Sequence, residues 1–180
     1  MLNTLKKEKD LVRMSRKRWF EETTGPEGYL AVEGRTGREF ILRIASGTDI
    51  YKAIKQFAKD KKIKVAKIHA AFMGGLQPAK FHMYAPDTVD PDNWANESET
   101  SEEKFSMVVS MSGIIQYDGI SEPTVKIHFV NAGKWDVQPF GGHLSPGSIV
   151  KGLFNVFVTE LSGLELVHRE GVEDWFKEVR

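Results

Sequence analysis

One segment of the 180-residue chain has the clear apolar spacing of a helix, and it limits the fold more than any other feature. Its apolar residues recur three or four positions apart, which places them on one helix face that packs on a core. They are Ile50, Ala53, Ile54, Phe57 and Ala58. Thr48 precedes this stripe and is the predicted N-cap. The rest of the fold must therefore consist mainly of strands arranged around one helix.

Most other apolar segments alternate with period two, as half-buried strands do. Within 124–130, for example, Val125 and Ile127 face one way while Lys126 and His128 face the other. The predicted strands are 39–45, 64–72, 79–84, 105–117 with a break at Gly113, 124–130, 148–160 and 164–168, the last of which closes the sheet. This pattern predicts an α+β fold in which a mostly antiparallel sheet packs on one main helix.

The chain length is that of about one domain. A turn cluster at 23–28 separates a basic N-terminal extension, 1–35, from the predicted domain, 36–170, which a short C-terminal helix or tail, 171–180, follows. We expect the acidic segment 87–103 to form a long loop. Gly141, Gly142 and the Pro146-Gly147 pair are expected to hold His143 in a tight loop.

The composition excludes several classes of protein. The chain has no cysteine, so disulfide scaffolds, cysteine zinc fingers, iron–sulfur clusters and thiol catalysis are ruled out. No apolar run approaches the roughly 20 residues that span a bilayer. We therefore expect a cytoplasmic protein with no membrane partner.

Charge is balanced overall, with 25 basic and 25 acidic residues, but unevenly distributed. Residues 1–18 carry seven lysines and arginines against two acids, whereas 87–103 carry seven acids and no base. The zero net charge argues against nucleic-acid binding by the whole molecule. Arg13, Arg16, Lys17 and Arg18, next to Trp19, are the candidate phosphate contacts.

Several short motifs follow one another in a fixed order. After the first strand and the lysine-rich helix come FMGGL at 72–76, SMSGI at 110–114, KIH at 126–128 and GGHLSPG at 141–147. This order resembles the PPC (plants and prokaryotes conserved) domain, a domain of unknown function. The resemblance implies a homotrimer whose mostly antiparallel sheet packs on a helix. Plant members place the domain after AT-hooks in DNA-binding proteins. No Arg-Gly-Arg-Pro core is present here, so the chain resembles the free-standing prokaryotic type.

The same resemblance implies a metal site, because some prokaryotic relatives hold zinc through histidines. Carried over to this chain, the ligands are His128 and His143, but Lys126 stands where the first histidine would be. Asn155 occupies a position where relatives often carry glutamate. Lysine ligates zinc only after losing its proton. A third ligand would have to come from His69 or His82. Zinc is the only cofactor that the sequence suggests, and nothing in the sequence requires a cofactor.

The residues themselves leave a second interpretation open. Lys126, His128 and His143, with the backbone N–H groups of Gly141 and Gly142, could bind a small anion. None of the common catalytic motifs is present, so catalysis is not expected. The main hypothesis is a trimeric assembly or regulatory module that contacts DNA non-specifically through its basic arm. The alternative is a small-anion or zinc site around His128 and His143, with or without catalysis.

Overall fold

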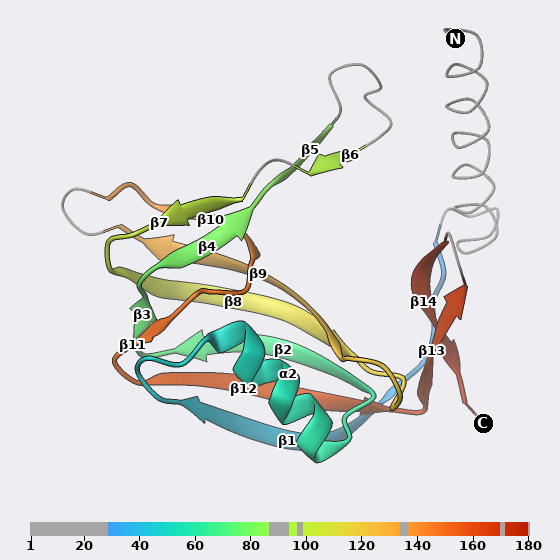
Figure 1. Ribbon diagram of the computed structural model, residues 1–180. Helices are drawn as coiled ribbons and strands as arrows, with labels where there is room; N and C mark the ends of the chain where they lie inside the picture. The colour runs from blue at the N-terminus through green and yellow to red at the C-terminus, as the bar shows by residue number, and fades with distance from the viewer. Residues whose placement is uncertain (1–28, 87–93, 97–98, 134–136, 170–171, 180) are drawn as a thin grey trace, which may run out of the picture. The chain divides into compact units, whose positions relative to one another are not determined.

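The computed structural model describes residues 29–86, 94–96, 99–133, 137–169 and 172–179 (Figure 1). Its main element is a ten-stranded sheet in which every pair of neighbouring strands is antiparallel. Eight strands follow one another across the sheet: β1 (Arg35–Ile44), β12 (Phe154–Ser162), β2 (Val65–Phe72), β8 (Ser106–Gln116), β9 (Thr124–Ala132), β10 (Phe140–Leu144), β4 (Ala79–His82) and β7 (Thr100–Glu102). The short strands β3 (Gly75–Leu76) and β11 (Val150–Lys151) pair beside this path. The predicted α+β class is confirmed.

The predicted helix is α2, Ile50–Lys61. Its buried residues, Ile50, Ile54, Phe57 and Ala58, are those of the predicted apolar stripe. The N-cap is Asp49 and not Thr48, because an Asp49 carboxylate oxygen accepts a hydrogen bond from the Lys52 backbone N–H at 3.1 Å. The Thr48 carbonyl instead accepts from the N–H of Val150 at 2.9 Å, which ties the start of the helix to β11.

The cap can be tested by replacing Asp49. Its second carboxylate oxygen also accepts from the Gly147 N–H at 2.9 Å, so Asp49→Ala leaves two N–H groups without their acceptor. Losing a helix cap costs about 1 kcal/mol, and we expect a loss of about 1–2 kcal/mol in the free energy of unfolding. Urea titration measures it. Thr48→Ala should cost clearly less, and equal losses would contradict the assignment of the cap.

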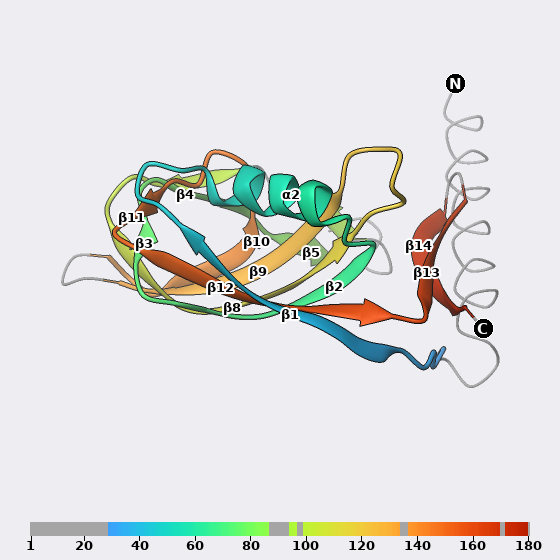
Figure 2. The ribbon, with the colours of Figure 1, turned by 90° about the horizontal axis from the view of Figure 1, so that it is seen from below.

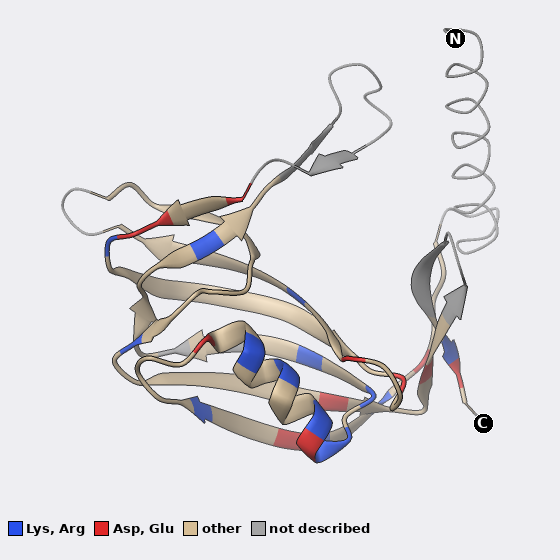
Figure 3. Ribbon diagram, in the orientation of Figure 1, with Lys and Arg blue, Asp and Glu red and all other residues tan. Residues whose placement is uncertain are grey.

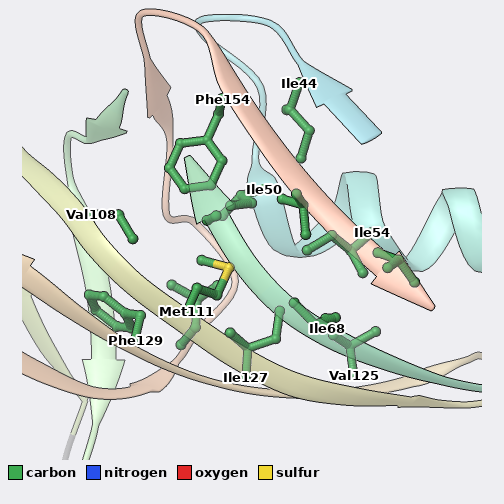
Figure 4. Packing of buried hydrophobic residues seen from close by; sticks show 14 of the residues in the cluster. Ile44, Ile50, Ile54, Ile68, Val108, Met111, Val125, Ile127, Phe129 and Phe154 are labelled. Atoms are coloured by element: carbon green, nitrogen blue, oxygen red, sulfur yellow. The ribbon is translucent and has the colours of Figure 1, made fainter. Parts of the chain in front are cut away.

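The core lies between α2 and one face of the sheet. Figure 4 shows Ile50 and Ile54 of the helix pointing at strand residues such as Ile68, Met111 and Ile127. All five of these side chains are almost fully buried. The alternation of the predicted strands has its cause here, because every second side chain of a strand faces the helix.

The other face of the sheet carries no helix among the described residues (Figure 2). On β9, Val125 and Ile127 are buried toward α2, whereas Lys126, His128 and Val130 project from the opposite face. We call this opposite face the open face. The described residues place no helix over these side chains.

Two strand predictions need correction. The tight loop expected around His143 is the strand β10, because Gly141, Gly142 and His143 all pair with β9. The single strand expected over 148–160 is divided into β11 and β12 at Gly152, where φ is 78°. A positive φ cannot continue a strand, and glycine adopts it most readily.

The predicted break at Gly113 is also wrong. Gly113 pairs in register with Ile127 and with Ile68, and the irregularity lies between Val108 and Ser110. A Cβ at Gly113 would lie 2.3 Å from the Lys126 carbonyl oxygen. The glycine therefore serves a close approach of two strands and not a bulge.

The two predictions for the C-terminal region are wrong, because both of its segments are strands that pair with each other. β13 (Leu164–Arg169) does not close the main sheet, and the short helix expected near the end is the strand β14 (Val172–Glu178). The two strands pair with each other as a separate two-stranded sheet. A helix this short is marginal alone, whereas a neighbouring strand supplies backbone partners.

The described chain divides into two units. The first, Arg35–Ser162, holds the sheet, α2 and the core. The second combines the chain on either side, of which 29–34, 163–169 and 172–179 are described. Most of the acidic segment 87–103 lies outside the described residues, but β6 (Trp94–Asn96) pairs with β5 (Tyr84–Pro86), and β7 also lies within it. None of the described helices has the length and hydropathy needed to cross a membrane.

Candidate functional site

Three histidines lie in a row on the open face. His128 of β9 pairs in register with His143 of β10, which in turn pairs with His82 of β4. Directly opposite residues of antiparallel strands lie on the same face of a sheet, so the three imidazoles adjoin one another. The ring centroid of His143 is 4.6 Å from that of His82 and 5.3 Å from that of His128. Together with Lys126 we call them the histidine cluster.

Two glycines bring His143 into this position. A Cβ at Gly141 would lie 2.3 Å from the Phe129 carbonyl oxygen of β9. A Cβ at Gly142 would lie 2.9 Å from the His82 carbonyl oxygen on β4. Only glycine lets β10 fit between these two strands. The pair of glycines therefore serves strand packing, and its role in the site is to place the next residue, His143, between the other two histidines.

The surroundings of His143 disfavour a proton on its ring. The pKa of the His143 imidazole is lowered to about 4, first because the ring is partly buried and then because His82, His128 and Lys126 repel a proton on it. His143 is therefore neutral at pH 7. On its other side, His82 is oriented by a 3.0 Å hydrogen bond between its Nδ1 and the Ser145 hydroxyl oxygen.

The low pKa predicts how the protein responds to acid. Unfolding returns His143 to a pKa near 6.5, so between about pH 6.5 and 4 the unfolded chain binds a proton that the folded chain does not. Stability therefore falls as the pH drops through this window, and the contribution of His143 is constant below it. NMR titration of the ring measures the pKa, and Lys126→Gln should raise it. A midpoint near 6.5 in the wild-type protein would contradict the prediction.

The cluster does not have the geometry of a metal site. The rings of His82 and His143 lie at 35° to each other with centroids 4.6 Å apart, so they are closer to stacked than to convergent. Imidazole nitrogens bind metals in the plane of the ring, which makes this arrangement a poor chelate. Across the described ranges, no three His, Cys, Asp or Glu side chains are grouped to hold an ion. Lys126 adds a positive charge beside His143. The residues present do not fit the zinc that the resemblance implies.

The other candidate ligands take different places. Asn155 is on β12, four strands from β10, and its side-chain oxygen accepts from the Arg43 Nε at 3.4 Å. His69 is on β2, three strands from β10, and contacts the Thr159 hydroxyl. Of the two histidines proposed as a third ligand, His82 is thus the one that lies beside His143.

His69 belongs to a second polar group on the open face. The Thr159 hydroxyl donates to a Glu39 carboxylate oxygen at 2.7 Å. Since the Thr159 proton is used in this way, its oxygen accepts from the Nε2–H of His69. Glu39 and Thr159 carry no signal of a site in the sequence, because nothing in the sequence shows that β1 and β12 are neighbours.

The anion interpretation is changed by the structure. Lys126 and His128 project from the same face of β9, and His143 lies beside His128, as that interpretation requires. Gly141 and Gly142, however, lie in a strand. Successive N–H groups of a strand point in opposite directions, so they do not form a concave anion site. The Lys126 ammonium and the two imidazoles remain as candidate anion contacts, and the backbone donors do not.

The proposed nucleic-acid contacts, Arg13, Arg16, Lys17 and Arg18, lie outside the described residues. The lysines of α2 are described and lie along its outer side (Figure 3). Lys59 pairs with Glu122, and the Lys52 Nζ lies 3.7 Å from an Asp49 carboxylate oxygen. This is the solvated face of an amphipathic helix, partly neutralised by acids.

Several solved structures share this fold. A plant- and prokaryote-conserved (PPC) protein of Pyrococcus horikoshii matches with a TM-score of 0.63 and 23% identity, over 84% of this chain and 99% of its own. A metal-containing protein of Archaeoglobus fulgidus matches with a TM-score of 0.62 and 25% identity, over 84% and 99%. A proposed DNA-binding protein of Bacteroides thetaiotaomicron matches with a TM-score of 0.60 and 18% identity, over 82% and 99%.

The sequence comparison points the same way. The model of the Plants and Prokaryotes Conserved (PCC) domain, the same domain as PPC, matches residues 31–162. The matched range includes the whole sheet, α2 and the histidine cluster. No curated protein sequence is similar enough to this chain to count as a relative.

Proposed function

The chain belongs to the Plants and Prokaryotes Conserved domain family, and on that premise we propose that it is a homotrimeric assembly or regulatory module that contacts DNA through its basic N-terminal arm. The observation that carries the assembly is the open face. Four of its strands each expose a large apolar side chain there: Ile41 on β1, Phe157 on β12, Met107 on β8 and Val130 on β9. Apolar groups spread over one uncovered sheet face favour burial against another protein surface.

A second copy of the chain is the occupant that the family resemblance implies, and the number three comes from that resemblance alone. Light scattering coupled to size exclusion measures the mass directly. We expect three times the 20.3 kDa of one chain at micromolar concentration. A mass of 20.3 kDa under these conditions would end the proposal.

The DNA contact rests on the charge of the arm, and two related folds are those of proposed DNA-binding proteins. Three arms on one trimer would add their weak contacts through avidity. Gel shifts over a range of salt concentrations test this, since each neutralised phosphate adds about 0.9 to the slope of log K against log salt.

The variant that neutralises Arg13, Arg16, Lys17 and Arg18 should lose most of that slope. Its control is Lys52→Gln with Lys55→Gln on α2, which should retain it. An arm variant with the wild-type slope would remove DNA from the proposal while leaving the assembly in place.

The histidine cluster supports a second candidate function, the binding of a small anion beside Lys126, His128 and His143. The supporting observation is that all three groups whose charge affects the pKa of His143, namely His82, His128 and Lys126, act to lower it. An anion would reverse that repulsion. Inorganic phosphate should then raise the melting temperature of the wild-type protein but not of Lys126→Gln, whereas a chelator should change neither. A melting temperature that phosphate does not move would exclude this candidate.

A further inference from the structure

The loop between β8 and β9 exposes an isoleucine at its tip. Ile120 is 93% exposed, the highest value among the large apolar side chains of the described residues. An isolated apolar side chain on a surface usually needs no explanation. Ile120 differs because the backbone around it is held in place.

Both ends of the loop are fastened. One Asp118 carboxylate oxygen accepts from the N–H groups of Ile120 and Ser121 at 2.8 Å, and the other accepts from the Ser121 hydroxyl at 2.9 Å. These hydrogen bonds lower the pKa of Asp118. Beyond the tip, Glu122 pairs with Lys59 of α2. Before it, the Tyr117 N–H donates to the Lys64 carbonyl at 2.7 Å. A fixed loop loses little conformational entropy when its apolar tip is buried by a partner.

The surroundings of Ile120 carry a positive charge. The loop rises on the same side of the sheet as α2 (Figure 2). Six lysines lie on α2 and the turn after it: Lys52, Lys55, Lys59, Lys61, Lys62 and Lys64. The helix segment and the loop also carry four acids, Asp49, Asp60, Asp118 and Glu122, so these two segments together have a net charge of +2. Asp60 is engaged by Gln56, and Asp118 by the loop itself.

We propose that the Ile120 loop and the lysine face of α2 form a docking surface for a protein segment that carries an apolar side chain flanked by carboxylates. The apolar group covers Ile120, and the carboxylates meet the lysines. Nucleic acid fits less well, because its phosphates could meet the lysines but would leave the apolar side chain of Ile120 uncovered. This surface is on the opposite side of the sheet from the open face, so both can be occupied at once.

Short fluorescein-labelled peptides test the proposal by fluorescence anisotropy. The first carries leucine and phenylalanine between glutamates, the second replaces its apolar residues by serine, and the third replaces its glutamates by lysine. We expect the full chain to bind only the first. Ile120→Ser should weaken binding by about tenfold, since burying an isoleucine contributes at least that factor. Lys52→Gln with Lys55→Gln should weaken it and reduce its dependence on salt.

The matched control is Met73→Ser, an exposed apolar side chain at the other end of β2 from the loop, which should leave peptide affinity unchanged. Ile120 is almost wholly exposed, so its replacement should not lower the melting temperature. Three results would each overturn the proposal: no binding of the first peptide at millimolar concentration, equal affinity for wild type and Ile120→Ser, or a change in oligomeric mass in Ile120→Ser. The last would identify the loop as a contact between copies.

Discussion

A chain that carries Ile41→Asp together with Phe157→Asp should run as a single 20.3 kDa particle in light scattering. The two side chains are 67% and 37% exposed and pair in register across β1 and β12, so the variant places two carboxylates side by side on the open face. An unpaired carboxylate buried in an interface costs about 4 kcal/mol, roughly a thousandfold in dissociation constant. The assembly should not survive this at micromolar concentration.

The fold of this variant should persist, because both side chains point away from the core. Circular dichroism and urea titration check that the monomer is folded. Ile120→Asp is the matched control, since it also adds a carboxylate at an exposed isoleucine but on the other side of the sheet. A doubly substituted chain that keeps the mass of the wild-type assembly would show that copies associate through another surface.

Replacing Gly141 by alanine should destabilise the protein and disturb the histidine cluster at the same time. The added Cβ would lie 2.3 Å from the Phe129 carbonyl oxygen, which belongs to the backbone of β9 and cannot rotate away. β10 must move away from β9, at the cost of ladder hydrogen bonds. We expect a loss of about 2–3 kcal/mol, which lowers the melting temperature by roughly 5–10 °C.

The effect on the site distinguishes this clash from general destabilisation. When β10 moves, His143 leaves its place between His82 and His128, so its pKa should rise toward 6.5. Gly119→Ala is the control: φ is 87° there, but nothing lies within 4 Å of the added methyl group. It should cost only about 1 kcal/mol and leave the His143 titration unchanged. Equal losses in the two variants would show that the approach of β10 to β9 is not tight.

Local patterns in the sequence predicted most of the elements. The stripe of α2 and the alternation of β9 arise from the burial of one face, and that burial is written in the spacing of apolar residues. The sequence alone predicts a helix or tail where β14 lies, because the partner that makes a strand favourable there, β13, is not apparent from local spacing. The exposure of Ile120 could not be predicted in the same way, because it depends on which other parts of the fold lie beside the loop.

The candidate site was only half visible in the sequence. His128 and His143 stood out through motifs that resemble a family, but His82 was one of two equal choices for their neighbour. Strand order decides between them: β4 lies beside β10, and β2 lies three strands away. Strand order depends on contacts between residues far apart in the chain, for which a single sequence carries no local signal.

By itself, then, the sequence determined the α+β class, the helix and the faces of the strands, because periodic burial depends on near neighbours. The tertiary structure alone decided that three histidines adjoin one another, that their geometry does not suit a metal, and that Glu39, Thr159 and His69 meet on the same face. Cross-strand register sets these contacts, and a shift of one residue would send each side chain to the other face.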